Sequence, residues 1–257
     1  MQDLRVAYGP NVAVDALSFN LDAGAALAIV GASGSGKSQT ALALLGLSGR
    51  RARTTGSVRF EGAELVGATP AQLAAVRGAR IGMVFQDSLA SLNPHLTLGR
   101  QVGEVLEQHR GLARTAALRE ALRLLQAVQI ADAARRLFQY PHEISGGMRQ
   151  RVAIAMALAA SPKLLIADEP TSALDMTVQA QVLELLAQLR RELGLALLLI
   201  THDFGVVEAL CERVLVLQRG QGVETGPTEH VLARPQHEYT RGLLSARPVL
   251  HGARADC

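Results

Sequence analysis

Eight residues near the start of the chain have the types and the spacing needed to hold phosphate groups. Residues 31–38 read Gly-Ala-Ser-Gly-Ser-Gly-Lys-Ser, which fits the pattern G-x-x-x-x-G-K-[ST]. Glycines let the backbone turn its N–H groups toward an anion, and Lys37 adds a mobile positive charge for β- and γ-phosphates. The Ser38 hydroxyl suits Mg²⁺. We therefore expect phosphate binding by Gly31, Ala32, Ser33, Gly34, Ser35, Gly36, Lys37 and Ser38.

The segments on either side of this loop have the order that the motif requires. Residues 25–30 form a short apolar run typical of a buried strand, and residues 39–45 read as a helix. A helix N-terminus adds unpaired N–H donors and the positive end of a dipole. The dinucleotide pattern G-x-G-x-x-G fails, because Gln39 stands where its third glycine should be. These flanks also argue against an unrelated glycine-rich turn.

Two carboxylates follow a second apolar strand, expected over residues 163–168. In an α/β fold the carboxyl end of such a strand faces the nucleotide, so Asp168 can hold Mg²⁺ and Glu169 can act as general base. The alternative is that both acids only cap a helix. We reject it because a phosphate loop in the same chain needs both a Mg²⁺ ligand and a base. His202 follows a third buried strand at 195–200. A lone histidine is usually structural, but this position at the nucleotide side favours a functional role.

Three further polar or aromatic positions are less specific on their own. Gln86 follows a strand expected at 80–85, where a surface amide is the commoner explanation. Ser145, Gly146 and Gly147 precede a helix expected over 150–160 and could form a second anion site or only a flexible cap. Tyr8, at the end of a strand beside Gly9, is either an ordinary strand-end aromatic or a ring free to stack on a base.

The elements that position these residues alternate between strands and helices. Residues 3–30 read as two or three strands, 56–62 as another strand, and 70–77 as a short helix. Within residues 99–140 apolar residues recur at helical spacing, so we expect a helical insertion over residues 88–158 in an otherwise α/β chain. An amphipathic helix is expected from 178 to 193, a last strand over 213–217, and short helices from 228 to 248.

Composition limits the remaining possibilities. Hydrophobic residues make up 49% of the 257 residues and aromatic residues only 3%, so Leu, Val, Ile and Ala must fill the core. The net charge of +3 is too small to argue for nucleic acid. Two cysteines make no disulfide framework or metal spacing, which favours a reducing compartment. We find no apolar signal region and no run near the ~18 residues of a membrane span, and expect a chain that is soluble by itself.

Taken in order, these motifs resemble those of the ATP-binding subunit of ABC transporters over nearly the whole chain. The most specific part is Ile144 to Arg151, which looks like that family's signature sequence. The resemblance implies an α/β P-loop NTPase fold, an ABC-type nucleotide-binding domain with an N-terminal antiparallel β region and an inserted helical subdomain. It divides the chain into a RecA-like ATP-binding core with the antiparallel region (1–87 and 159–226), a helical signature subdomain (88–158) and a short C-terminal helical tail (227–257).

The resemblance also implies a role for each motif residue, with ATP and Mg²⁺ as ligands. Tyr8 would stack on adenine, and residues 31–38 would bind the phosphates. The catalytic residues would be Glu169 as base, His202 on the γ-phosphate and Gln86 as sensor of the attacking water. The Mg²⁺ site would comprise Ser38, Gln86 and Asp168. Two sets of residues would act across a dimer interface. The turn of Ser145, Gly146 and Gly147 would touch ATP held by the partner subunit, and Asp175 would belong to a loop that crosses the interface.

Three segments narrow the resemblance to the importers of peptides and nickel. These are Phe85 to Pro94, the signature with Met148 in place of the usual Gln, and Pro235 to Leu244, which departs from the group's pattern at Glu238. Longer members of this group continue into a cysteine-containing tail, so an end at Cys257 slightly favours the shorter nickel or metallophore importers.

The implied partners are a second ABC ATPase subunit, in a hetero- or homodimer, and two membrane permease subunits. An extracytoplasmic solute-binding protein would act indirectly, with this chain peripheral on the cytoplasmic face of the membrane. Two alternatives remain: an ABC ATPase of DNA repair or translation, and a catalytically silent regulatory subunit. Against the first, the segment between Gln86 and Ser145 is short for a long coiled coil, so no nucleic acid partner is expected. Against the second, Lys37, Asp168, Glu169 and His202 are all present.

Overall fold

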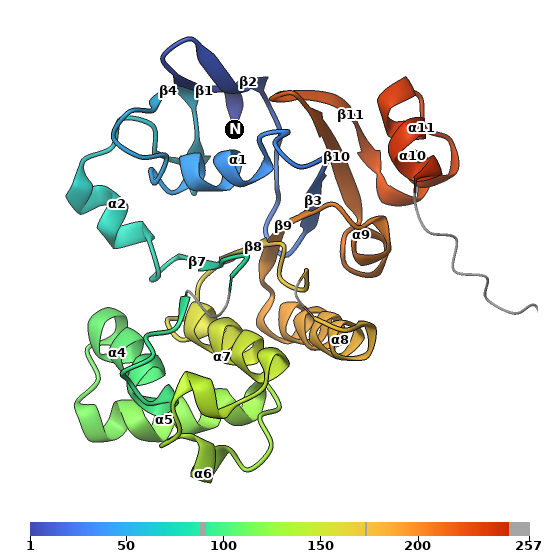
Figure 1. Cartoon of the computed structure of the whole chain (residues 1–257). Helices are drawn as coiled ribbons and strands as arrows, with labels where there is room; N and C mark the ends of the chain where they lie inside the picture. Colours follow the sequence, from blue (N-terminus) through green and yellow to red (C-terminus); the bar gives the residue numbers. More distant parts are fainter. Residues whose placement is uncertain (88–90, 173, 247–257) are drawn as a thin grey trace, which may run out of the picture.

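Two main β-sheets and a separate group of helices build the molecule (Figure 1). The computed structural model describes residues 1–87, 91–172 and 174–246. A six-stranded sheet has the strand order β11-β10-β3-β9-β8-β7, and a three-stranded sheet has the order β2-β1-β4. This is the mixed α/β architecture that the sequence predicts, with antiparallel strands at the N-terminus.

The six-stranded sheet carries its chemistry at one edge. Five of its strands are parallel, and only β11 is antiparallel to its neighbour. Every residue of β3, β8 and β9 is buried, which explains their unbroken apolar sequences. Because parallel strands end on the same side, the residues that follow them meet there. The parallel strands are β3 (Ala26–Val30), β7 (Ile81–Val84), β8 (Leu164–Asp168), β9 (Ala196–Thr201) and β10 (Arg213–Gln218).

Alternate residues of these strands belong to two different cores. Ile29, Ile166 and Ile200 pack with α1 (Lys37–Leu44) and the antiparallel strands. Their neighbours in the sequence pack with α7 (Gly146–Leu158), α8 (Met176–Leu193) and α9 (Phe204–Leu210) on the other face of the sheet. The sheet is therefore clamped between two apolar layers, which fixes the positions of its strand ends.

The N-terminal sheet pairs β1 (Gln2–Tyr8) with β2 (Asn11–Leu17) and β4 (Arg53–Ser57). The single strand expected over 56–62 is wrong. The chain leaves β4 after Ser57 and forms a hairpin of β5 (Arg59–Phe60) and β6 (Ala63–Glu64). The break occurs because the Glu64 carboxylate accepts the N–H of Val58 at 2.8 Å in place of a neighbouring strand. The short helix α2 (Pro70–Val76) follows, with a capping box at Thr69.

The helical insertion lies at the end of the molecule away from the N-terminal sheet (Figure 1). The insertion begins after β7, and the chain returns through α7 into β8. Helix α7 is the helix expected over 150–160, and it starts four residues earlier, at Gly146. Ser145 is its cap, since its hydroxyl accepts the N–H of Met148 at 3.4 Å. Among the described residues, no helix combines the length and apolar character needed to cross a membrane. The elements before α7 are α4 (Leu98–Arg110), α5 (Arg114–Ala127), α6 (Ala133–Arg136) and η1 (Pro141–Glu143).

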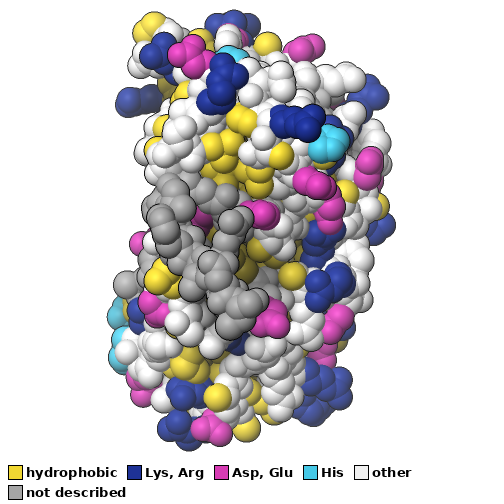
Figure 2. Space-filling view, turned by 90° about the vertical axis from the view of Figure 1, so that its right-hand side faces the viewer, with side chains coloured by type: hydrophobic (Ala, Val, Ile, Leu, Met, Phe, Trp, Pro, Cys, Tyr) yellow, Lys and Arg dark blue, Asp and Glu magenta, His cyan; other side chains and the backbone are white. Residues whose placement is uncertain are grey.

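The C-terminal part adds β11 (Gln221–Pro227), α10 (Thr228–Ala233) and α11 (Glu238–Ser245) at the other side of the sheet from β7. The sequence did not predict β11, because it lacks an apolar run or alternation, with Val223 its only large apolar residue, and four of its seven residues are exposed. On the face that carries α10 and α11, basic and acidic side chains are interspersed around a group of apolar ones (Figure 2).

Candidate active site

The phosphate-loop candidate joins β3 to α1, as its flanks predict. Gly36 is the residue before α1 and adopts the left-handed region at φ 105°. A Cβ on Gly36 would lie 2.3 Å from the carbonyl oxygen of Ala13 on β2. Only glycine fits between that strand and the start of the helix, so the antiparallel sheet fixes the position of the loop.

Lys37 lies inside this loop and is only 6% exposed. Its ammonium group donates to the carbonyl oxygens of Gly31 at 2.8 Å and Ala32 at 3.0 Å. Burial lowers the pKa of Lys37, and the nearby charges of Glu169 and Asp168 act against that shift. The structure therefore holds a desolvated positive charge at the mouth of a loop of backbone donors.

Asp168 ends β8 beside this lysine and is 5% exposed. Burial raises the pKa of Asp168, and a hydrogen bond with Ser38 partly offsets this. Among the described residues, neither its buried Oδ1 atom nor the buried hydroxyl of Ser35 has a hydrogen-bond partner. A buried carboxylate oxygen beside a serine hydroxyl is a hard oxygen donor set, so these residues fit Mg²⁺.

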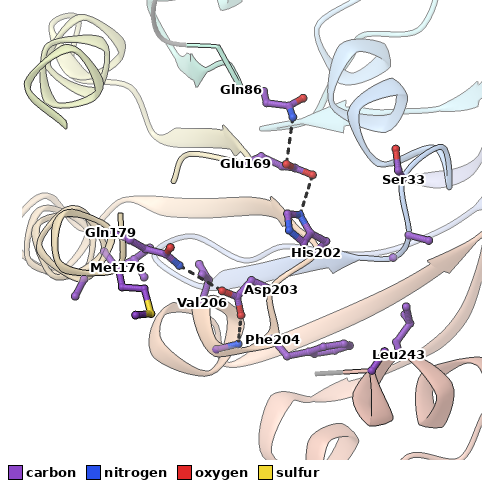
Figure 3. A pocket seen from close by; sticks show the side chains of 16 residues that line it. Ser33, Gln86, Glu169, Met176, Gln179, His202, Asp203, Phe204, Val206 and Leu243 are labelled. Atoms are coloured by element: carbon purple, nitrogen blue, oxygen red, sulfur yellow. Dashed lines mark hydrogen bonds and ion pairs between the residues drawn. The ribbon is translucent and has the colours of Figure 1, made fainter. Parts of the chain in front are cut away.

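Glu169 is the centre of a chain of three side chains from three different strand ends (Figure 3). Its Oε2 atom accepts a hydrogen bond from Nε2 of Gln86 at 3.2 Å, and its Oε1 atom lies 3.3 Å from Nδ1 of His202. Its backbone is left-handed at φ 45°, and its N–H donates to the carbonyl of Ile200 at 2.8 Å. A strained residue held by the neighbouring strand points its carboxylate toward the loop, an arrangement typical of functional sites.

A cavity is lined by Glu169, its two side-chain partners and the start of the phosphate loop, but not by Lys37, Ser38 or Asp168 (Figure 3). One wall is polar and contains Gln86, Glu169 and His202, with the start of the phosphate loop at 31–33. The opposite wall is apolar and comes from α8, α9 and α11, with Met176, Leu183, Phe204, Val206 and Leu243 among its residues. The geometry thus offers a place for an anion, a metal ion and a base close to one another.

The turn at residues 145–147 does not line this cavity. It forms the first turn of α7, and its two glycines differ. A Cβ on Gly147 would lie 2.3 Å from Cγ1 of Val178 on α8, whereas a Cβ on Gly146 would meet nothing closer than 3.8 Å. Packing among the described residues explains the glycine at 147 and leaves the glycine at 146 unexplained.

Comparison with known proteins shows which family has this arrangement of residues. The family model described as ABC transporter matches residues 14–172, which is more than half of the chain. The chain belongs to the ABC transporter family. The structure of this chain superimposes on a dimeric ATP-binding cassette in a post-hydrolysis state bound to ADP and Pi. The TM-score is 0.75 and the sequence identity 29%, and the alignment covers 88% of this chain and 98% of that one.

Other relatives of this ABC protein carry more specific names. The oligopeptide transport ATP-binding protein OppD of Haemophilus influenzae is 50% identical over 95% of this chain and 76% of its own length. A putative peptide import ATP-binding protein of Brucella abortus is 51% identical over 96% of this chain and 75% of its own length. The ABC transporter component cbiO1 of Clostridium perfringens superimposes at a TM-score of 0.76 with 26% identity, covering 91% of each chain.

Tyr8 and Asp175, which the family resemblance gives roles, also do not line the cavity. Tyr8 is partly buried, and its hydroxyl oxygen lies 2.5 Å from Oε1 of Gln39 and 2.6 Å from the carbonyl oxygen of Ser48, so that it is hydrogen-bonded within the chain. Its stacking on adenine stays a prediction. Asp175 is the N-cap of α8, where its Oδ1 atom accepts the N–H groups of Thr177 and Val178. Its role at a dimer interface also stays a prediction. Within the importer motif 85–94, residues 88–90 lie outside the described residues.

Sequence reasoning missed one residue that touches the phosphate loop of this ABC domain. The hydroxyl of Tyr239 on α11 accepts the N–H of Ala32 at 3.0 Å. The two residues are 207 positions apart, so no local pattern could have paired them. The only signal was the tail motif around Tyr239, which marked the importer group without giving this tyrosine a role.

Proposed function

We propose that the chain is the ATP-hydrolysing subunit of a peptide importer. The observation that carries this function is the approach of Gln86 and His202 to one carboxylate, Glu169, beside a phosphate loop. The peptide part rests on relatives about half identical to this chain, which are named as peptide or oligopeptide import proteins. Those names argue against the slight preference for nickel import that the position of Cys257 suggested.

In the proposed mechanism, Glu169 accepts the proton of the attacking water, and Gln86 and His202 hold its carboxylate in place from two sides. Lys37 exchanges the carbonyls of Gly31 and Ala32 for phosphate oxygens when nucleotide binds. Mg²⁺ held by Ser38, Gln86 and Asp168 would neutralise phosphate charge.

A second ATPase subunit completes the proposed site. Gly146 lies at the start of α7, where the helix end presents N–H donors and the chain leaves room for close approach. We propose that Ser145, Gly146 and Gly147 contact the γ-phosphate of ATP held by that subunit, with Asp175 at the interface. Two permease subunits would receive the resulting movement, and a solute-binding protein outside the cell would deliver the peptide. The chain would then lie at the cytoplasmic face of the membrane.

The decisive experiment compares two variants of the full chain. Glu169→Gln should keep ATP binding and lower hydrolysis at least about 100-fold, because it removes the base and leaves the phosphate loop intact. Glu184→Gln, the same change at an exposed site on α8, should hydrolyse ATP normally. Lys37→Ala should lose nucleotide affinity. Normal turnover by the Glu169 variant would refute the base assignment, and unchanged affinity of the Lys37 variant would refute the phosphate loop.

The nucleic-acid alternative is not favoured. The helices α4 and α5 of the insertion have 13 and 14 residues, which is too short for the long coiled coil of that class. Charges of both signs are interspersed on the face shown in Figure 2, with no continuous basic surface among the coloured residues there. DNA-stimulated hydrolysis with a steep salt dependence would contradict the importer proposal.

A further inference from the structure

The contact between α11 and the phosphate loop joins two parts of the chain that the mechanism treats separately. The N–H of Ala32 donates to the hydroxyl of Tyr239 at 3.0 Å. The carbonyl of Gly31, which belongs to the same peptide group, accepts from the Lys37 ammonium at 2.8 Å. One peptide plane is therefore held at both ends, by the loop's own lysine and by a helix from the C-terminal part.

These two anchors differ in what nucleotide binding does to them. Lys37 is the charge that must turn toward the phosphates, and it weakens its bond to Gly31 when it does so. Gly31 has no Cβ to restrict its backbone, so the peptide that follows it can rotate at low cost. The hydroxyl of Tyr239 then remains as the anchor that keeps the plane in its orientation.

The structure also fixes α11 in the place that this contact requires. The Glu224 carboxylate on β11 accepts the N–H groups of Gln236 at 2.8 Å and His237 at 3.1 Å, immediately before α11 begins. The ring nitrogen Nδ1 of His237 accepts the N–H of Tyr239 and caps the helix. Leu243, one turn further along α11, lines the same cavity as residues 31–33 (Figure 3).

We propose that Tyr239 is a positioning residue, which fixes the Gly31–Ala32 peptide so that the docking of α11 on β11 sets the affinity of the phosphate loop for nucleotide. This inference rests on the proposed function, because it requires that the loop binds ATP. It assigns to the C-terminal helix a task at the catalytic site, although no residue of that helix touches the reacting groups.

The test uses the full chain and measures KM for ATP, kcat and nucleotide affinity. Tyr239→Phe removes only the hydroxyl and should raise KM and the dissociation constant about fivefold, the effect of one ordinary hydrogen bond, with kcat changed less than about twofold. Ser245→Ala is the matched control. It removes a hydroxyl of the same helix that donates to the carbonyl of Arg241, and KM for ATP and the dissociation constant should both stay unchanged.

A second variant tests the docking itself. Glu224→Ala should raise KM in the same direction, and the double variant Tyr239→Phe/Glu224→Ala should be no weaker in binding than the weaker single variant, since both act through one contact. An unchanged KM in Tyr239→Phe, a loss confined to kcat, or full additivity in the double variant would overturn the proposal. Lys37→Ala separates the two hypotheses: if it binds ATP normally, the proposed function fails, whatever Tyr239→Phe does.

Discussion

The two glycine-containing turns of this ABC protein answer to different constraints. In the phosphate loop, the chain itself demands the glycine at 36, because β2 leaves no room for a side chain. In the signature turn, the chain demands the glycine at 147 but has space for a side chain at 146. A residue type that internal packing does not require points to a contact with something outside the chain. We therefore propose that the phosphate-loop half of the site is built within one polypeptide, and that the signature turn is a second half-site that meets another molecule.

The largest effect should come from Gly36→Ala. The new methyl group would clash with the Ala13 carbonyl and the residue would keep an unfavourable left-handed backbone, so we expect a loss of about 3 kcal/mol of unfolding free energy. Gly34→Ala is the control, because Gly34 also has a positive φ but open space around it, and should lose only about 1 kcal/mol. Urea unfolding without nucleotide measures both, and equal losses would contradict the steric argument.

The signature glycines should separate stability from activity. Gly147→Ala should lose about 2 kcal/mol, because its methyl group meets Val178. Gly146→Ala should keep or slightly raise the stability, since alanine favours a helix, and should nonetheless lower ATP hydrolysis at least about tenfold. The measurements are thermal unfolding and steady-state hydrolysis. Full activity in Gly146→Ala would remove the reason for an external contact at this turn.

Sequence patterns predicted this site well where a motif is local. The phosphate loop lies between a strand and a helix because its neighbours are apolar runs of the right lengths, and Ser145 caps α7 as its type suggested. Buried strands β3, β8 and β9 were recognisable because both of their faces are covered.

Features that depend on distant neighbours could not be predicted. The left-handed backbone of Glu169 follows from its bond to the end of β9, and the break after β4 follows from the side chain of Glu64. Strand β11 is polar, and only its pairing with β10 makes it a strand. Tyr239 reaches the loop only because α11 folds back over β11.

Asp168→Asn tests whether the phosphate-loop half of the site holds a buried charge that lowers the stability of the fold. Burial raises the pKa of Asp168, so the folded state binds a proton more readily than the unfolded state. The stability therefore falls as the pH rises from the unfolded-state pKa of Asp168 to its raised pKa in the folded state. A neutral amide removes this penalty. We expect the variant to be about 1 kcal/mol more stable than wild type at pH 7, with the gain shrinking as pH falls below the raised pKa. Unfolding measured across pH without Mg²⁺ decides; a variant less stable at pH 7 contradicts it.

The smallest loss of stability should come from Ser145→Ala. Its capping bond is long at 3.4 Å, so the loss should be about 0.5 kcal/mol. Hydrolysis should fall by a larger factor than this loss explains, if the hydroxyl also meets a phosphate across the interface. Ser145→Thr keeps a hydroxyl and should retain most of the stability. A fall in hydrolysis fully accounted for by unfolded protein would assign Ser145 a capping role alone.

The insertion with α4 to α7 leaves the central sheet after β7 and rejoins it at β8, and these two strands are neighbours at one border of that sheet. Both connections of the insertion to the sheet lie at that border, and its helix α7 also packs against α8 on one face of the sheet. Gln86 follows β7 and donates a hydrogen bond to Glu169, so we expect a movement of the insertion to act first on Glu169, the proposed general base. At the opposite border of the sheet, we expect α11 and Tyr239 to stay in place while the insertion moves.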